Sequence, residues 1–338
     1  MKKLRVIQIG VGHDHTIDVL ESVIRLSYVF ELVALAIPPS EEIDFAERIK
    51  QHCDIKGIKK LSVEEALALG NIDGAIIETE EINLTKYAQM AADRGLHIHM
   101  DKPGGLSVSD YERLINTVKQ KGLTFSTGYM YRFNYKVIEA LEKIKKGDIG
   151  EVYCIEAHMD CEHPTEKRQW LSQFSGGMTF FLGCHLIDII FRVMGEPLEV
   201  EPLNCSTGID GVTAEDFGMV LFKYRHGYSF AKACAMEPGG FNRRQIVFCG
   251  SKGTLEIKPL EIYDSDADSN LNMYTYMNET YANEGWYALG KRQKTSLYNR
   301  YDDMMINYAM IALGERENPY TYEYELELYK LVLRACGI

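Results

Sequence analysis

The sequence lacks the features of a membrane protein or a nucleic-acid-binding protein. No segment approaches the roughly 20 consecutive apolar residues of a membrane-spanning helix. Met1-Lys2-Lys3 leads directly into an apolar run, without the core of a signal peptide. The formal net charge of -12 would repel a phosphate backbone, and no block of lysine and arginine offsets it. We therefore expect a cytoplasmic protein that binds no nucleic acid and no membrane.

The sequence also lacks a cysteine framework. Its 8 cysteines are scattered, and no C-x-x-C pair occurs. Cys154, Cys234 and Cys249 lie in apolar runs, where a reduced thiol behaves as a small hydrophobic side chain. Neither disulfides nor a zinc ribbon are indicated. The 338 residues, 46% of them hydrophobic, are enough for two domains with their own cores.

The first third of the chain alternates between apolar strands and amphipathic helices. These strands are apolar throughout, as in a parallel sheet covered by helices on both faces. The pattern predicts a doubly wound α/β domain over residues 1–125. The expected strands are 4–9, 30–36, 74–78, 96–99 and 124–127, and the expected helices are 16–26, 43–51, 63–69, 85–94 and 108–120.

The pattern changes after Gly128. One long helix is expected over 136–146, and a turn over 147–150 leads into strands rich in tyrosine, valine and phenylalanine. His226-Gly227 is typical of a β-hairpin turn. This pattern therefore predicts an α+β domain with a mostly antiparallel sheet over residues 126–338. No repeat or low-complexity tract separates the two halves, so we expect a hinge near residues 125–130.

A glycine-containing turn follows the first expected strand. Its sequence is Gly10-Val11-Gly12-His13-Asp14-His15, where a dinucleotide-binding fingerprint has G-x-G-x-x-G. The first two glycines suit a tight turn and the close approach of a pyrophosphate, but His15 replaces the third. We expect Gly10, Gly12 and His13 to bind a dinucleotide. The alternative is that both histidines are surface residues at a helix end.

The acidic residue that would bind the adenosine ribose is missing at the end of the second expected strand. That position holds Ile37, followed by Pro38-Pro39, and no arginine replaces the acid. Ser40-Glu41-Glu42 just beyond would disfavour a 2′-phosphate. We therefore expect NAD as the cofactor, with NADP as the alternative.

A lysine that packing does not explain follows the run 96–99. Lys102 stands between Asp101 and Pro103, and the proline restricts its backbone to an extended shape. The carboxyl end of a parallel strand faces the crevice where open α/β sheets bind ligands. Lys102 is therefore a candidate catalytic residue. The alternative is a solvated lysine in a strand-to-helix turn.

Several short motifs occur in the order found in one known family. They are the Gly10/Gly12 turn, Asp101-Lys102-Pro103, Tyr131-Arg132-Phe133-Asn134, Gly176-Gly177-Met178 before Gly183-Cys184-His185, and Gly250-Ser251-Lys252-Gly253. By this ordered set the chain resembles the Gfo/Idh/MocA oxidoreductase family. The resemblance implies an N-terminal Rossmann domain, a C-terminal domain whose large open sheet often forms an oligomer interface, and NAD(P)-dependent hydride transfer. A homodimer or homotetramer is expected.

The resemblance also implies roles for single residues. Lys102 matches the lysine of the family's Glu-Lys-Pro motif, near the nicotinamide ribose and the reacting hydroxyl, with Asp101 as a shorter acid. His185 matches the histidine of an Asp-x-x-x-His motif and would be the general acid or base, unless it is a core histidine. The aspartate position is Phe181. Asp188 would either orient the His185 ring or be a surface or capping carboxylate.

Further side chains are candidate ligands of the cofactor or the substrate. Thr79, after the strand 74–78, is assigned to the cofactor together with Asp101, Lys102 and Arg132. Tyr131 and Arg132 occupy the family segment that usually faces the cofactor or substrate, and an interdomain ion pair is the alternative for Arg132. Trp170 precedes the glycine loop at a spacing that suits a pocket wall. The substrate set is Lys102, Tyr131, Trp170, His185 and Asp188.

A dense run of polar residues resembles a metal-binding segment. It contains Glu156, His158, Asp160, Cys161 and His163. The even-numbered residues through Asp160 share one strand face. We expect no metal, because solvated polar groups are the commoner cause of such a run.

These observations predict an NAD(P)-dependent oxidoreductase that moves a hydride to or from a sugar, polyol or inositol-like alcohol. Ile37, His15 and Phe181 all depart from the family pattern at functional positions. Two alternatives therefore stay open. One is a family member that binds a ligand without redox turnover, as a sensor or assembly protein. The other is a NAD-assisted enzyme that eliminates a glycoside.

Overall fold

The computed structural model describes residues 2–263 and 272–338. Its internal contacts divide the chain into two compact units, Met1–Tyr129 with Tyr301–Tyr329 and Met130–Arg300 with Lys330–Ile338. We expected residues 126–338 to form one domain, whereas Tyr301–Tyr329 packs with the first unit. A domain boundary between residues 125 and 126 stays a prediction. Within the described ranges, no helix has both the length and the apolar character to cross a bilayer.

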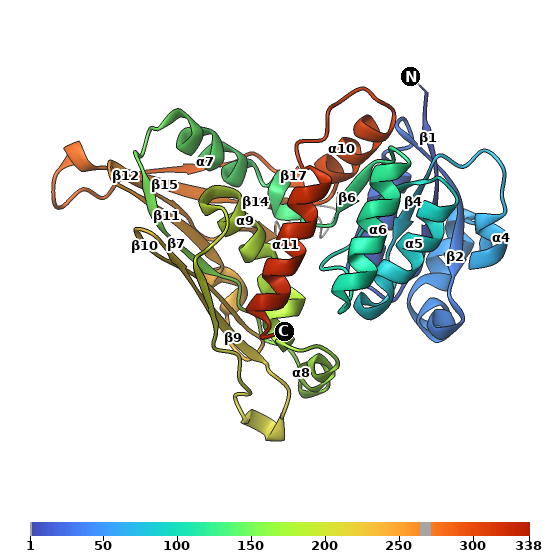
Figure 1. The fold of residues 1–338 in the computed structure, drawn as a ribbon, viewed down its shortest axis with the longest axis horizontal. Helices are drawn as coiled ribbons and strands as arrows, with labels where there is room; N and C mark the ends of the chain where they lie inside the picture. The colour runs from blue at the N-terminus through green and yellow to red at the C-terminus, as the bar shows by residue number, and fades with distance from the viewer. Residues whose placement is uncertain (1, 264–271) are drawn as a thin grey trace. The chain divides into compact units, whose positions relative to one another are not determined.

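A six-stranded parallel sheet forms the centre of the first unit (Figure 1). Its strand order, β3-β2-β1-β4-β5-β6, is that of a dinucleotide-binding fold, in which ligands bind at the carboxyl ends of the strands where the order reverses. The predicted doubly wound sheet is confirmed. The strands are β1 (Leu4–Ile9), β2 (Phe30–Ile37), β3 (Lys60–Ser62), β4 (Gly74–Ile77), β5 (His97–Met100) and β6 (Phe125–Thr127).

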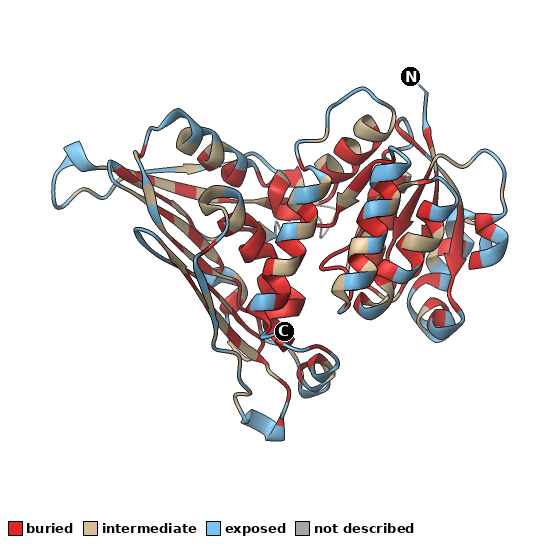
Figure 2. Cartoon of the chain, in the orientation of Figure 1, coloured by how far each residue is buried: buried red, intermediate tan, exposed pale blue. Residues whose placement is uncertain are grey.

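The apolar strands explain why this sheet is covered on both faces. Val6, Ile7 and Ile9 of β1 are fully buried, and Figure 2 shows burial running along the strands. The edge strand β3 was not predicted, because its short Lys-Leu-Ser sequence lacks an apolar run. The helices between the strands are α1 (Thr16–Arg25), α2 (Glu42–Asp44), α3 (Lys50–Lys56), α4 (Val63–Leu67), α5 (Leu84–Asp93) and α6 (Val108–Gln120).

Two tyrosines from the end of the chain complete the core of the first unit. They lie on α10 (Asp302–Ala312) and α11 (Tyr322–Ala335). The Tyr308 hydroxyl donates to the His97 carbonyl at 2.9 Å. The ring of Tyr329 stacks on that of Tyr111, with centroids 4.0 Å apart. The segment that returns from the second unit is therefore part of the packing of the first.

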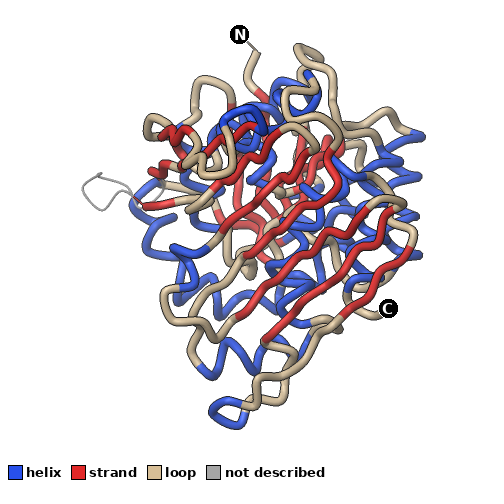
Figure 3. Tube along the Cα trace, turned by 90° about the vertical axis from the view of Figure 1, so that its left-hand side faces the viewer, coloured by secondary structure: helices blue, strands red, loops and turns tan. Residues whose placement is uncertain are grey.

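An eight-stranded sheet dominates the second unit, and Figure 3 shows its strands side by side. The order is β16-β15-β12-β11-β7-β10-β9-β8, and all neighbours are antiparallel except β7 and β10. The predicted mostly antiparallel sheet and the hairpin at His226-Gly227 are confirmed. The strands are β7 (Val152–His158), β8 (Glu199–Pro202), β9 (Phe217–Tyr224), β10 (Gly227–Cys234), β11 (Gln245–Gly250), β12 (Gly253–Ile257), β15 (Tyr276–Tyr281) and β16 (Lys291–Lys294).

Helix α9 places polar residues in the interior of the second unit. Leu186, Ile187 and Ile190 of α9 are fully buried, so the helix is held in the core by its apolar side chains. His185 and Asp188 are buried with them. The other described elements of this unit are α7 (Tyr135–Lys146), α8 (Thr165–Trp170), α9 (Cys184–Met194) and the small sheet of β13 (Ile262–Tyr263), β14 (Asn272–Tyr274) and β17 (Tyr298–Asn299).

Candidate active site

The glycine turn at the carboxyl end of β1 has the backbone shape of a nucleotide-binding turn. Gly10 has a φ of +91°, a conformation that side chains rarely adopt. A Cβ atom at Gly10 would overlap both the backbone and the side chain of Thr79. Thr79, predicted to bind the cofactor, therefore lies directly against the turn. Only glycine at position 10 allows β1 and the residues after β4 to approach this closely.

The Glu41 carboxylate, which was expected only to disfavour a 2′-phosphate, occupies the donors of this turn. Glu41 is fully buried, and its Oε2 accepts hydrogen bonds from the amides of Val11 at 2.6 Å and Gly12 at 2.9 Å. Its Oε1 accepts from the amide of Glu80 at 3.0 Å. Burial raises the pKa of Glu41, although the three amide bonds oppose the shift. Glu41 lies four residues beyond Ile37 and holds the amides of the turn itself.

A buried ionisable cluster surrounds the Asp101-Lys102 pair at the carboxyl end of β5. The Lys102 residue is only 1% exposed. Asp101 lies 3.2 Å from Nδ1 of His13 and 3.0 Å from Nδ1 of His15. Burial would raise the pKa of Asp101, but the two imidazoles and the Lys102 ammonium hold it well below the usual value. The alternative of a solvated surface lysine at position 102 is therefore wrong.

His13 is an interior residue. Its side chain is 0% exposed, and its Nε2 lies 3.3 Å from the carbonyl oxygen of Lys102. Burial lowers the pKa of His13 to about 3, although the charge of Asp101 opposes the shift. The imidazole is therefore neutral near pH 7. The alternative of a surface histidine at a helix end does not hold for His13.

In the second unit, His185 contacts the ring of Tyr131. The two rings meet edge to face, with centroids 5.2 Å apart, and both residues are buried. The Tyr131 hydroxyl donates to Glu261, and Arg300 donates to the same hydroxyl at 2.9 Å. Burial and the charge of Glu261 raise the pKa of Tyr131, so the phenol keeps its proton. The Tyr131 ring is thereby fixed beside His185.

Asp188 is held by Arg132 in a two-pronged ion pair. Nε of Arg132 donates to Oδ2 at 2.9 Å, and its Nη2 donates to Oδ1 at 2.7 Å. Each side chain is 2% exposed. The alternative of a surface carboxylate at Asp188 is therefore wrong. Asp188 and Arg132 belong to the same unit, and an interdomain ion pair for Arg132 stays a prediction.

Comparison with family models matches both parts of the chain. Residues 4–129 match the oxidoreductase family with an NAD-binding Rossmann fold, and residues 137–256 match the GFO/IDH/MocA C-terminal domain. The chain belongs to the Gfo/Idh/MocA family. The resemblance inferred from the ordered motifs is confirmed, and so is the two-part fold that it implies.

The relatives of this Gfo/Idh/MocA chain have several different activities. A myo-inositol 2-dehydrogenase of Thermotoga maritima is 22% identical over 75% of this chain and 74% of its own length. A solved structure from Desulfitobacterium hafniense has a TM-score of 0.81 at 20% identity, covering 100% of this chain and 95% of that one. A 3-ketoreductase of Actinomadura kijaniata, solved with NADP, has a TM-score of 0.79 at 16% identity over 98% and 96%. The chain spans only 45%, 39% and 59% of three other curated relatives.

Phe181, at the aspartate position of the Gfo/Idh/MocA motif, belongs to an aromatic cluster. Its ring centroid lies 5.4 Å from that of Trp170, and Nζ of Lys167 lies 4.7 Å from it. Residues Thr179–Gly183 form a π-helical turn before α9. The α-helical spacing by which we related Phe181 to His185 therefore does not apply. The role of Trp170 as a pocket wall stays a prediction.

A dinucleotide phosphate can bind the amides of the glycine turn only if the Glu41 side chain, which now accepts their hydrogen bonds, moves away. The amides of Val11 and Gly12 suit an anion, as the bound Glu41 carboxylate demonstrates. A Cβ at Gly12 would lie 2.7 Å from Cγ of Glu80 and 3.0 Å from Cδ of Glu41. The space that the second glycine leaves open is thus filled by two acidic side chains. The donors fit NAD(P), and Glu41 must leave them for it to bind.

Of the run from Glu156 to His163, only Glu156 belongs to a group of clustered metal-ligating side chains among the described residues. Asp160 pairs with Lys232 at 3.1 Å, and His158 packs against the ring of Phe230. Among the described residues, the groups whose ligand atoms lie within 4.8 Å of one another are His13 with His15 and Asp101, and Cys154 with Glu156 and Cys249. The members of the run 156–163 therefore face different partners.

Proposed function

We propose that the protein is an NAD(P)-dependent oxidoreductase that transfers a hydride to or from a sugar, polyol or inositol-like alcohol. One observation carries the proposal. A buried lysine, Lys102, and the glycine turn Gly10–Gly12 both lie at the carboxyl edge of a parallel sheet, on neighbouring ends of β5 and β1 around β4. A buried ammonium at this edge is the group needed beside an alcohol oxygen that gains negative charge.

In this proposal each candidate residue has a separate task. Lys102 hydrogen-bonds the reacting hydroxyl and stabilises its developing charge. His185 is the general acid or base, with Tyr131 fixing its ring. Gly10, Gly12, His13 and Thr79 bind the cofactor, and Trp170 and Asp188 remain candidates for the substrate pocket. Bound NAD(P) supplies the hydride chemistry at its nicotinamide.

The proposal is tested by titration with NADH and NADPH, followed by fluorescence of the reduced nicotinamide. We expect saturable binding of at least one of them. A panel including myo-inositol and D-xylose, assayed for change in reduced cofactor, then looks for turnover. Absence of binding at millimolar concentrations of both cofactors would overturn the proposal.

One observation favours a second candidate, a family member that binds ligands without redox turnover. The Glu41 carboxylate already uses the amides of the glycine turn, and Glu80 fills the space beside Gly12. A protein that had lost its cofactor could keep this arrangement permanently. The titration with NADH and NADPH distinguishes the two candidate functions, because only the oxidoreductase binds a nicotinamide cofactor.

Replacement of Glu41 by alanine should tighten the binding of NADH by about tenfold or more. The two amides that it frees each make a hydrogen bond to a charged group, and such bonds are worth roughly 1.5–3 kcal/mol. The measurement is the dissociation constant of NADH for Glu41→Ala and for the unchanged protein. Glu42→Ala is the matched control, because Glu42 is exposed and pairs with Lys60. Weaker binding in Glu41→Ala would instead make Glu41 a ligand of the cofactor ribose.

A further inference from the structure

Two histidines and an aspartate bring their ligand atoms together at the carboxyl edge of the parallel sheet. Nδ1 of His13 lies 3.2 Å from Oδ2 of Asp101, and Nδ1 of His15 lies 3.0 Å from the same oxygen. All three ligand atoms lie within 4.8 Å of one another. In a tetrahedral zinc site, bonds of about 2.0–2.2 Å place neighbouring ligand atoms roughly 3.3–3.5 Å apart. The two measured distances are therefore close to those between ligands of one metal ion.

The contacts of His13 identify Nδ1 as the nitrogen that would bind the ion. The backbone amide of His15 donates to Nδ1 at 3.2 Å, so Nδ1 carries a lone pair rather than a proton. The other nitrogen, Nε2, lies 3.3 Å from the carbonyl oxygen of Lys102, to which it then donates. A histidine that binds a metal through one nitrogen commonly donates its other N–H to a backbone carbonyl in this way. His13 thus has the orientation of a metal ligand.

This tautomer of His13 leaves two carboxylates facing a lone pair. Oδ2 of Asp101 lies 3.2 Å from Nδ1 of His13, and Oε2 of Glu78 lies 3.9 Å from it. Two acceptors at such distances repel each other unless a cation lies between them. Glu78 is fully buried, and among the described residues no donor reaches either of its carboxylate oxygens. A metal ion would remove the repulsion and would have Glu78 within reach as a further ligand.

The buried groups around His13 carry an excess of negative charge. Three carboxylates and one ammonium lie here, and each of the four residues is at most 1% exposed: Asp101, Glu78, Glu81 and Lys102. Buried charges are costly unless opposite charges compensate them, and one divalent cation would balance this formal excess. The side chain of His15 is 13% exposed, which gives an ion a route from solvent.

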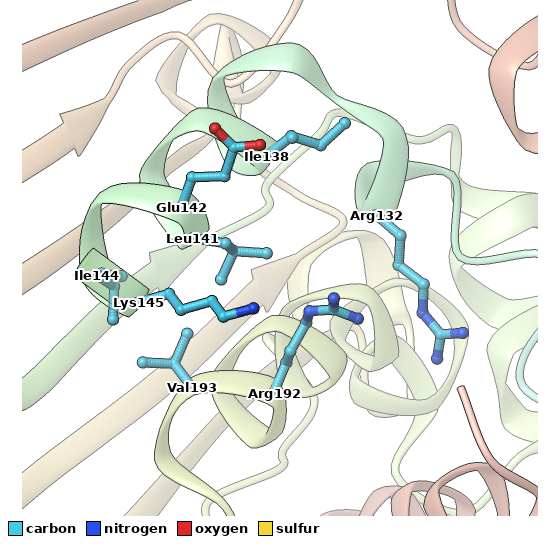
Figure 4. Close-up of a pocket in the computed structure, with 8 residues that line it drawn as sticks. All are labelled: Arg132, Ile138, Leu141, Glu142, Ile144, Lys145, Arg192 and Val193. Atoms are coloured by element: carbon cyan, nitrogen blue, oxygen red, sulfur yellow. The ribbon is translucent and has the colours of Figure 1, made fainter. Parts of the chain in front are cut away.

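The groove along α7 and α9 in the second unit has the opposite character (Figure 4). Among its described lining residues, Lys145 and Arg192 are accompanied by one carboxylate, Glu142. Arg132 also lines the groove, but it is held by Asp188. These cations would repel a metal ion, whereas the cluster around His13 would attract one.

We propose that His13, His15 and Asp101 bind one divalent transition-metal ion. Zn²⁺ suits this set best, because it prefers imidazole and carboxylate ligands in a tetrahedron. Glu78 or a water molecule supplies the fourth ligand. The ion would hold the glycine turn after β1 against the end of β5. The inference goes beyond the proposed function, because the ion binds without any nicotinamide.

The first test is calorimetric titration of Zn²⁺ into protein that has been stripped with a chelator and contains no nicotinamide. His15→Ala is the test variant, because His15 is partly exposed and its loss leaves the buried residues in place. His52→Ala is the matched control, since His52 belongs to the same unit and pairs with Glu21 at 3.2 Å, outside the cluster. Mg²⁺ is the control ion, because it prefers oxygen ligands.

We expect Zn²⁺ to bind about 100-fold more weakly to His15→Ala than to the unchanged protein, because loss of a group that only orients a metal ligand already costs roughly 10–100-fold. His52→Ala should bind Zn²⁺ like the unchanged protein, and Mg²⁺ should bind far more weakly than Zn²⁺. No binding of Zn²⁺ by the unchanged protein, unchanged affinity in His15→Ala, or an equal loss in His52→Ala would each overturn the inference. Failure here is distinct from failure of the NADH titration.

A second measurement separates this site from the group of Cys154, Glu156 and Cys249, which also offers zinc ligands. Co²⁺ is added to Cys154→Ser in place of Zn²⁺. We expect the visible absorption of tetrahedral Co²⁺ without the near-ultraviolet band that thiolate ligands produce. Loss of metal binding in Cys154→Ser, or a thiolate band that persists in it, would overturn the inference. This spectrum keeps the proposal testable if His15→Ala does not fold.

Discussion

Replacement of Lys102 by methionine should reduce turnover roughly 10³-fold while NADH still binds, because one positioned charge and one proton donor are lost together. Methionine keeps most of the apolar stem of a side chain that is 1% exposed, so packing around it changes little. The measurement is the rate of change of reduced cofactor with the best alcohol of the panel, alongside the NADH dissociation constant.

Lys86→Met controls for the loss of a lysine as such, because Lys86 is exposed on α5 in the same unit. It should keep full turnover. A Lys102→Met protein with undiminished turnover would show that the buried ammonium has only a structural role. Circular dichroism and the thermal transition separate this outcome from misfolding.

Replacement of Asp188 by alanine should cost about 3–5 kcal/mol of stability, since it leaves the guanidinium of Arg132 buried without its carboxylate. For a unit of this size we expect the midpoint of thermal unfolding to fall by roughly 10 °C. Differential scanning calorimetry gives this midpoint directly. Replacing both residues, as Arg132→Met with Asp188→Leu, should recover much of the loss, because neither charge then remains buried.

Glu199→Ala is the control for this prediction, because Glu199 pairs with Lys223 on the exposed surface of the β8–β9 edge. An exposed pair of that kind contributes about 0–1 kcal/mol, so the midpoint should hardly move. If Asp188→Ala were as stable as Glu199→Ala, the Arg132–Asp188 pair would not contribute to the folded state in the way we describe.

Much of the fold could be predicted from the sequence because strands buried on both faces are uniformly apolar. Residues 4–9 and 108–120 were assigned with the limits that β1 and α6 have. The edge strand β3 could not be found in this way, because an exposed strand needs no apolar pattern. The return of Tyr301–Tyr329 to the first unit was also missed, since local patterns do not say which core a helix joins.

The candidate site was predicted less completely, because its partners are distant in sequence. Glu41 reaches the glycine turn from the short helical turn Pro39–Glu41, four residues beyond the position where the acid was expected. Arg132 and Asp188 were both singled out, yet nothing in the sequence connects them. A short-range motif identifies candidate catalytic and binding residues. Which side chains pair with them and set their ionisation state depends on the fold.

The return of Tyr301–Tyr329 to the first unit has a consequence for biosynthesis. Chains generally fold domain by domain from the N-terminus as they leave the ribosome. Here Tyr111 and His97, the first residue of β5, receive their partners, Tyr329 and Tyr308, only when the last part of the chain has been made. The core of the nascent first unit therefore stays incompletely packed until the whole second unit has been translated. A fragment ending at residue 125 would lack these contacts permanently.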